Sequence, residues 1–181
     1  MSHPSNLRLP VPVHDSDHVI GPQGAQVTVV KYGDYECPDC QKMHRSIEKM
    51  TRELLNDVRL VYRHFPLVNV HPHALRAAEA AEAAAAQGKF WEMHTLLFRY
   101  PDKFDNKVLR KHAREIGLDL DKFDDEMARG VHADEILKNR KLSISQGITG
   151  TPTFFVNDEL WAMSGIKLIE GITALVEQRV D

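Results

Sequence analysis

The feature that most constrains this chain of 181 residues is its pair of cysteines, Cys37 and Cys40, which are the two cysteines of the sequence. An apolar run rich in β-branched residues, Val27 to Tyr32, precedes the pair. Apolar residues at helical spacing follow it, namely Met43, Ile47, Met50 and Leu54. The sequence therefore predicts a strand that runs into a helix. Proline suits the first position of a helix, so Pro38 makes Cys37 the expected N-cap.

This position changes the chemistry of Cys37. The first backbone N–H groups of a helix have no intrahelical partner and the helix dipole is positive there, so an anion at the N-cap is stabilised. The thiolate is the nucleophilic form of cysteine, and in such surroundings its pKa falls from about 8.5 to roughly 3.5–7.5. We expect Cys40, one turn further on, to be less exposed. It should remain a thiol until Cys37 forms a mixed disulfide that it can attack.

Composition and charge restrict the function further. The length suggests one domain, perhaps with an insertion. Two cysteines so close together cannot close a long loop, so they are not a structural disulfide framework. With 23 Lys and Arg against 26 Asp and Glu, the net charge is −3, which argues against a nucleic-acid partner. No stretch is apolar over the length of a membrane span, so we expect none.

The first 26 residues contain four prolines and a polar patch, and we expect them to form an extended arm with little structure of its own. Its histidines, including His14 and His18, are expected to be solvated. The start of the chain lacks the apolar core of a secretory signal. We therefore expect a cytoplasmic protein, or a periplasmic one if a leader has been removed.

The rest of the chain follows an α/β pattern. Residues 58–65 alternate with period two, so a second strand and a βαβ unit with a parallel pair are expected. From Pro72 to about Gln146 the pattern is helical throughout. Two short apolar runs around Asn157-Asp158 then predict a hairpin, and an amphipathic helix follows. We expect one domain from residues 27–70 and 148–181, with a helical subdomain inserted at 71–147.

Several motifs in this order resemble the DsbA-like thiol-disulfide oxidoreductases of the thioredoxin superfamily. The resemblance covers roughly residues 18 to 178. It is carried by a strand ending in Asp-Tyr-Glu-Cys-Pro-Asp-Cys at residues 34–40 and by Arg-His-Phe-Pro-Leu at 63–67. His-Pro-His-Ala at 71–74, Phe-Trp-Glu-Met-His at 90–94 and Gly-Thr-Pro-Thr-Phe-Phe-Val at 150–156 complete it.

The resemblance implies a thioredoxin fold with an inserted all-helical subdomain and Cys37-Pro38-Asp39-Cys40 as the redox pair. It also implies a cis peptide bond before Pro152, which packs against Cys37, and a Thr151 backbone that pairs with an extended substrate. Protein or peptide thiols and disulfides are the implied partners; glutathione and a recycling partner stay open. No cofactor is expected.

Two departures from the family affect the expected redox behaviour. The strongly oxidising relatives carry a histidine between the cysteines, whereas this chain has Asp39. A carboxylate about 5 Å from the sulfur costs on the order of 1–3 kcal/mol, so Asp39 and Glu36 should raise the pKa of Cys37. Lys31 stands where relatives usually have a buried carboxylate, and its charge should offset part of this effect. We therefore hypothesise a less oxidising protein that acts as a reductase or isomerase.

Other interpretations of the same residues stay open. The fold could serve a peptide-binding, chaperone-like module in which the redox pair is secondary. Cys37, Cys40 and His44 could also be zinc ligands, since Cys-x-x-Cys is a common half-site. We expect a surface role for His71 and His73 at a helix start. His64 and His94 are expected to be core or interface residues, because they fall within apolar stretches.

Overall fold

The computed structural model describes residues 7–54, 56–101, 104–162 and 165–178. Within these residues the strands form one five-stranded sheet with the order β1-β3-β2-β4-β5. Strands β2 and β3 are parallel and the other neighbouring pairs are antiparallel, which confirms the predicted βαβ unit and hairpin. The strands are β1 (His18–Ile20), β2 (Val27–Gly33), β3 (Val58–His64), β4 (Thr153–Val156) and β5 (Glu159–Trp161).

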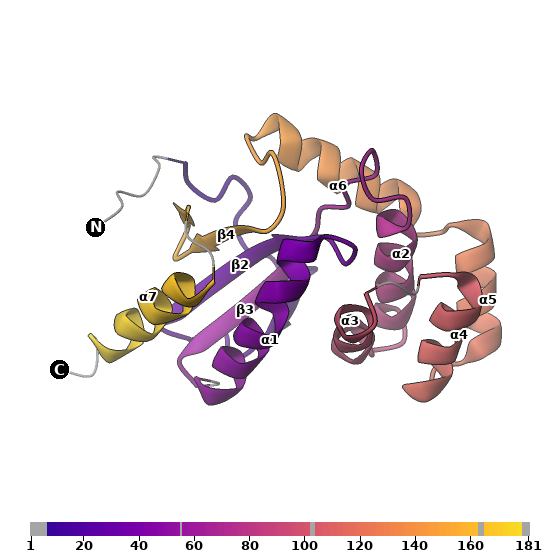
Figure 1. Cartoon of the computed structure of the whole chain (residues 1–181), viewed down its shortest axis with the longest axis horizontal. Helices are drawn as coiled ribbons and strands as arrows, with labels where there is room; N and C mark the ends of the chain where they lie inside the picture. Colours follow the sequence, from indigo (N-terminus) through magenta and orange to yellow (C-terminus); the bar gives the residue numbers. More distant parts are fainter. Residues whose placement is uncertain (1–6, 55, 102–103, 163–164, 179–181) are drawn as a thin grey trace.

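The two faces of the sheet bury alternate residues of each central strand. Val27 and Val29 of β2 pack in one apolar cluster with Met43, Ile47 and Met50 of α1 (Pro38–Glu53). Helix α7 (Ile166–Glu177) belongs to the same cluster, and Figure 1 shows α1 and α7 on the same face. The intervening side chains are buried in a second cluster, which includes Val30, Tyr32 and Phe155. This is the period-two alternation of a strand that is buried on both faces.

In the described part of the chain, five helices follow β3 and precede β4, and Figure 1 places them beside the sheet, with α6 extending above it. They are α2 (Ala74–Ala85), α3 (Phe90–Arg99), α4 (Asn106–Glu115), α5 (Leu120–Arg129) and α6 (Ala133–Ser145). Asp105 and Asp119 are the N-caps of α4 and α5, and each accepts hydrogen bonds from two backbone N–H groups of the helix that follows. Five alanines of α2 have no exposed surface, so neighbouring elements approach this helix closely: Ala77, Ala80, Ala81, Ala83 and Ala84.

The N-terminal arm differs from the expectation, because part of it belongs to the sheet. Residues His18–Ile20 form β1, which pairs with β3. The guanidinium of Arg63 donates to both carboxylate oxygens of Asp17 and to the carbonyl oxygens of Val11 and Pro12. These contacts between distant segments give the arm a fixed course that its own polar composition does not indicate. Residues 1–6 of the expected arm lie outside the described residues.

Candidate active site

Cys37 lies at the junction between the β2 loop and α1. It is the N-cap of α1, with extended backbone angles (φ −71°, ψ 119°), and Pro38 is the first helical residue, as the sequence predicted. The Cys37 thiol donates a hydrogen bond to the carbonyl oxygen of Thr151, with 3.5 Å between donor and acceptor. The Thr151–Pro152 peptide bond is cis. The fold therefore brings the start of β4 to the first turn of α1.

The surroundings of Cys37 favour its thiolate. A hydrogen bond from the Cys40 side chain makes the largest contribution to lowering the pKa of Cys37 to about 5. Burial opposes this effect, while the Thr151 side chain and the backbone N–H groups of Cys40 and Asp39 add to it. The Cys40 side chain is fully buried, and burial raises its pKa far above the ordinary value. The sulfur of Cys37 is thus favoured as a thiolate nucleophile, and the sulfur of Cys40 stays protonated.

Lys31 is buried in β2, next to both cysteines. Only 1% of its surface is exposed, and its ammonium lies over the ring of Phe98, 4.5 Å from the ring centroid. Burial lowers the pKa of Lys31 to about 8, although the negative charges that Cys40 and Cys37 can carry act in the opposite direction. A cation at this depth has its closest compensation in an ionised sulfur, so the charges of Lys31 and the cysteines are coupled.

The two acidic residues near Cys37 bind other partners. Asp39 is exposed and pairs with the ammonium of Lys42 at 3.1 Å. The carboxylate of Glu36 accepts from the backbone N–H of His73 at 2.8 Å and lies 3.0 Å from its imidazole. Each carboxylate is thus directed to a nearby donor, and the rise in pKa expected from Asp39 and Glu36 is outweighed, because the pKa of Cys37 is lowered to about 5.

Asp34 is a residue of the site that the sequence interpretation missed. Its buried carboxylate accepts hydrogen bonds at 2.8 Å from the backbone N–H groups of Glu36 and Leu67, and it pairs with Nδ1 of His71 at the same distance. The side chain of His71 is consequently only 15% exposed, which corrects its expected surface role. The bond from Asp34 to Glu36 is an Asx turn, and an Asp just after a strand is a signal for that turn.

The other histidines near the cysteines are packed among aromatic rings. Nδ1 of His94 lies 3.0 Å from the hydroxyl of Tyr35, and the imidazole of His44 stacks on Phe98. Burial lowers the pKa of His44 to about 4. Within the described ranges, the side chains of Cys37, Cys40 and His44 do not form a group that could hold one metal ion. The zinc interpretation of these three residues therefore lacks the required geometry.

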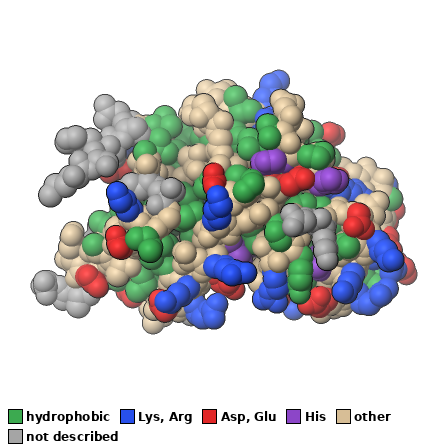
Figure 2. Space-filling view, viewed as in Figure 1, with side chains coloured by type: hydrophobic (Ala, Val, Ile, Leu, Met, Phe, Trp, Pro, Cys, Tyr) green, Lys and Arg blue, Asp and Glu red, His purple; other side chains and the backbone are tan. Residues whose placement is uncertain are grey.

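The exterior carries charges of both signs. Lys and Arg side chains are interspersed with Asp and Glu over the face shown in Figure 2, in keeping with the small net charge of −3. No helix in the described part of the chain is both long and apolar enough to cross a membrane.

Comparison with known proteins agrees with this geometry. The family model described as thioredoxin matches residues 14–177. The chain belongs to the thioredoxin family. Among solved structures, a thioredoxin-like oxidoreductase from Silicibacter pomeroyi DSS-3 is 28% identical, with a TM-score of 0.75 over 91% of this chain and 94% of that one. BdbD from Bacillus subtilis is 23% identical, with a TM-score of 0.80 over 97% of this chain and all of that one. This likeness confirms the thioredoxin fold of DsbA-type proteins.

The curated relatives are much longer proteins. The Na(+)/H(+) antiporter NhaA 3 of Salinispora tropica is 49% identical over 155 residues, which are 83% of this chain and 23% of that protein. The antiporter NhaA of Herminiimonas arsenicoxydans is 35% identical over 161 residues, or 89% of this chain and 25% of that protein. The chain thus spans about a quarter of the length of these relatives. Their name describes the longer proteins.

Proposed function

We propose that this protein is a thiol-disulfide oxidoreductase that exchanges disulfides with protein substrates. The observation that carries the proposal is the position of Cys37 at the N-cap of α1, with its pKa lowered to about 5 and a protonated Cys40 beside it. At neutral pH such a sulfur is a thiolate, which is the form that attacks disulfides.

The exchange uses the two sulfurs in turn. In the reducing direction, the Cys37 thiolate attacks one sulfur of a substrate disulfide and the other substrate sulfur leaves as a thiolate. Cys40 then gives its proton to the substrate thiolate released in the first step and attacks Cys37 in the mixed disulfide, which releases the second substrate thiolate and leaves Cys37–Cys40 oxidised. The substrate gains two electrons and the protein loses two. In the oxidising direction the same steps run in reverse.

We expect an extended peptide to bind beside Cys37. The ladder between β4 and β2 begins at Thr153, so the backbone of Thr151 lies beyond it. Peptides commonly add to such a segment as an extra strand, because main-chain hydrogen bonds give affinity without demanding one sequence. With Thr151 in contact with Cys37, a peptide paired there has its cysteine close to the nucleophile.

The low pKa of Cys37 favours donation of disulfides over reduction. A pKa of about 5 stabilises the reduced form roughly 100-fold at pH 7, which raises the reduction potential by about 60 mV for a two-electron couple. This argument opposes the reductase or isomerase preference that Asp39 and Glu36 suggested. Glutathione disulfide or a second redox protein would then reoxidise Cys37 and Cys40.

The test is oxidation of a reduced two-cysteine peptide by the oxidised protein, together with the equilibrium constant against glutathione. We expect Cys37→Ser to abolish exchange and Cys40→Ser to accumulate the mixed disulfide. Lys122→Gln, on α5, serves as a control and should retain the activity. Exchange that survives Cys37→Ser would contradict the function. A potential near that of thioredoxin, about −270 mV, would contradict only the direction.

A further inference from the structure

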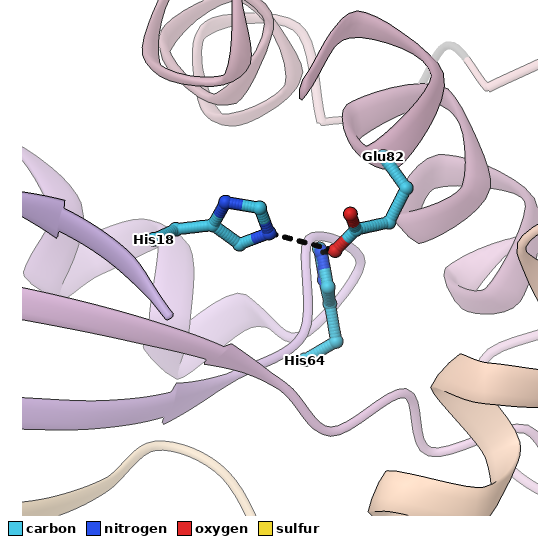
Figure 3. A group of neighbouring side chains, drawn as sticks. All are labelled: His18, His64 and Glu82. Atoms are coloured by element: carbon cyan, nitrogen blue, oxygen red, sulfur yellow. Dashed lines mark hydrogen bonds and ion pairs between the residues drawn. The ribbon is translucent and has the colours of Figure 1, made fainter. Parts of the chain in front are cut away.

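Three side chains outside the Cys-x-x-Cys motif meet at the junction of the sheet with the helical insertion. His18 comes from β1, His64 from the end of β3 and Glu82 from α2 (Figure 3). Nε2 of His18 lies 2.7 Å from Oε1 of Glu82, and Nε2 of His64 lies 3.0 Å from the same oxygen. The three ligand atoms all lie within 4.8 Å of one another. Figure 3 shows both imidazoles directed at the one carboxylate.

One ring nitrogen in this cluster has no hydrogen-bond partner within the described chain. Nε2 of His64 is buried, and although it is close to Glu82 its orientation does not make a hydrogen bond. The side chain of His64 is only 7% exposed, so bulk water does not replace the missing partner freely. A buried polar atom left unpaired costs about 1–3 kcal/mol. His64 thus directs an unused donor or acceptor at a carboxylate that already binds His18.

We propose that His18, His64 and Glu82 bind a divalent transition-metal ion, with Zn²⁺ as the ion to test. Imidazole and carboxylate are ordinary ligands of zinc, and three protein ligands with one open position is a common arrangement. Ca²⁺ and Mg²⁺ prefer sets of oxygen ligands, so two imidazoles select against them.

The two imidazole-to-carboxylate distances are close to those that a bound ion requires, and the ring nitrogens of His18 and His64 lie within 4.8 Å of each other. Zinc–nitrogen and zinc–oxygen bonds of about 2.0–2.2 Å place tetrahedral donors roughly 3.3 Å apart. The two distances to Glu82, 2.7 and 3.0 Å, therefore have to increase by about half an ångström or less on average. All three residues also line a cavity of about 480 Å³, which can hold a water molecule in the fourth position.

The surroundings favour the ionised carboxylate and fixed rings that a metal requires. Burial would raise the pKa of Glu82, but the two imidazoles of His18 and His64 beside it hold that pKa well below its usual range. The ring of His18 stacks on Phe90, with the centroids 3.5 Å apart and the planes within 6°. The ring of His64 packs edge-on against Tyr62 and Phe90. These contacts limit the freedom that the two ligands would lose on binding.

A metal at this site would connect three separate parts of the fold. His18 and Glu82 are 64 positions apart in the sequence, and His64 lies between them. Since the three come together only in the folded chain, an ion bound there stabilises the native state by mass action. The ion would hold the N-terminal strand and β3 against the helical insertion.

The experiment measures Zn²⁺ binding to a Cys37→Ser, Cys40→Ser double variant, because the two thiols could bind zinc themselves. Titration calorimetry and elemental analysis after dialysis should give one Zn²⁺ per chain, and the melting temperature should rise with Zn²⁺ concentration. Adding Glu82→Gln or His64→Gln should weaken binding at least tenfold. Ca²⁺ should not bind at this site.

A matched control is available in the pair His73 and Glu36, whose Nδ1 and Oε1 atoms are also 3.0 Å apart. His73→Gln should leave Zn²⁺ affinity unchanged, because that pair has no third ligand beside it within the described residues. If Glu82→Gln does not fold, as judged by circular dichroism, His18→Gln replaces it. Failure of the thiol-free protein to bind Zn²⁺, or binding that is indifferent to these ligand substitutions, would overturn the proposal. These two results would not contradict the proposed disulfide exchange, because that activity is measured on the protein with both cysteines present.

Discussion

Cys37 donates its thiol hydrogen to the carbonyl oxygen of Thr151, a residue 114 positions later in the chain. The side-chain hydroxyl of Thr151 is buried and makes no hydrogen bond within the described chain. When Cys37 ionises it no longer donates, and the Thr151 side chain contributes to lowering the pKa of the sulfur. The carbonyl oxygen of Thr151 therefore accepts from the Cys37 thiol, whereas its side chain stabilises the Cys37 thiolate.

Replacing Thr151 by valine tests this role, because the substitution preserves the shape and removes the hydroxyl. We expect Thr151→Val to raise the pKa of Cys37 by about one to two units, since a hydrogen bond to a charged group contributes roughly 1.5–3 kcal/mol. The ultraviolet absorbance of the thiolate as a function of pH measures the change. Thr151→Ser keeps the hydroxyl and should behave like the parent; an unchanged pKa in the valine variant would refute the role.

The hydrogen bond from Cys40 can be separated from its place in the disulfide. We expect Cys40→Ala to raise the pKa of Cys37 more than Cys40→Ser does, because serine keeps a donor beside the sulfur. This follows from the Cys40 side chain making the largest single contribution to the lowered pKa. The pKa of Cys37 in each variant is measured from the rate of its alkylation by iodoacetamide, at intervals of roughly one pH unit between about pH 4 and 9. Equal pKa values in the two variants would exclude this contribution.

Lys31→Met should stabilise the reduced protein at pH 7 by up to about 3 kcal/mol. Burial lowers the pKa of Lys31 from 10.5 to about 8, so the unfolded chain binds more protons between these values. The stability of the parent should therefore rise with pH across this window, and the advantage of Lys31→Met should shrink there. Denaturant unfolding at several pH values measures both effects. Lys31→Arg keeps the buried charge and should not stabilise the protein. If Lys31→Arg stabilised the protein as much as Lys31→Met does, that result would refute the argument.

Arg63→Met should lower the free energy of unfolding by about 3–5 kcal/mol, because it leaves the buried carboxylate of Asp17 without its guanidinium partner. The side chains of Arg63 and Asp17 are 11% and 5% exposed, and the guanidinium also binds the carbonyl oxygens of Val11 and Pro12. Loss of these bonds should expose residues 7–20 to limited proteolysis. By comparison, Arg8→Met removes an exposed pair with Glu159 and should cost less than about 1 kcal/mol.

The same pair predicts a pH dependence. Burial raises the pKa of Asp17, but the hydrogen bonds and charge of Arg63, together with the backbone N–H and charge of His14, more than compensate, so its pKa is lowered below 3.8. A lowered carboxyl pKa gives stability that is present above the unfolded value and is lost as the pH falls through the folded value. The difference in stability between the parent and Asp17→Asn should therefore decrease in acid. A difference that stays constant down to pH 2, about two units below the ordinary pKa of an aspartate, would contradict this assignment.

The elements of the fold could be predicted from the sequence because most carry local signals. Pro38 marks the first turn of α1, and the spacing of Leu168, Ile172 and Val176 defines the buried side of α7. The short turn at Asn157-Asp158, where both residues have positive φ, separates two apolar runs. The placement of the cis Thr151–Pro152 bond near Cys37 was implied by the family resemblance, since no local pattern connects residues so distant in sequence.

The features that could not be predicted depend on contacts between residues that are distant in the sequence. Strand β1 has three residues, too few for a periodic pattern, and is held by pairing with β3. His18 is consequently packed on Phe90 instead of being solvated. The directions of Glu36 and Asp39 are set by His73 and Lys42, whose positions follow from the completed fold. Side-chain direction was thus the step that sequence reasoning could not supply.

Asp34 joins the turn that carries the reactive sulfur to the segment that leads into the helical insertion, through Glu36 on one side and Leu67 and His71 on the other. Because one carboxylate anchors both segments, the sulfur and the base of the insertion form a single mechanical unit. A displacement of the insertion relative to the sheet would then be transmitted to Cys37 through Asp34 and through the neighbouring contact between Glu36 and His73.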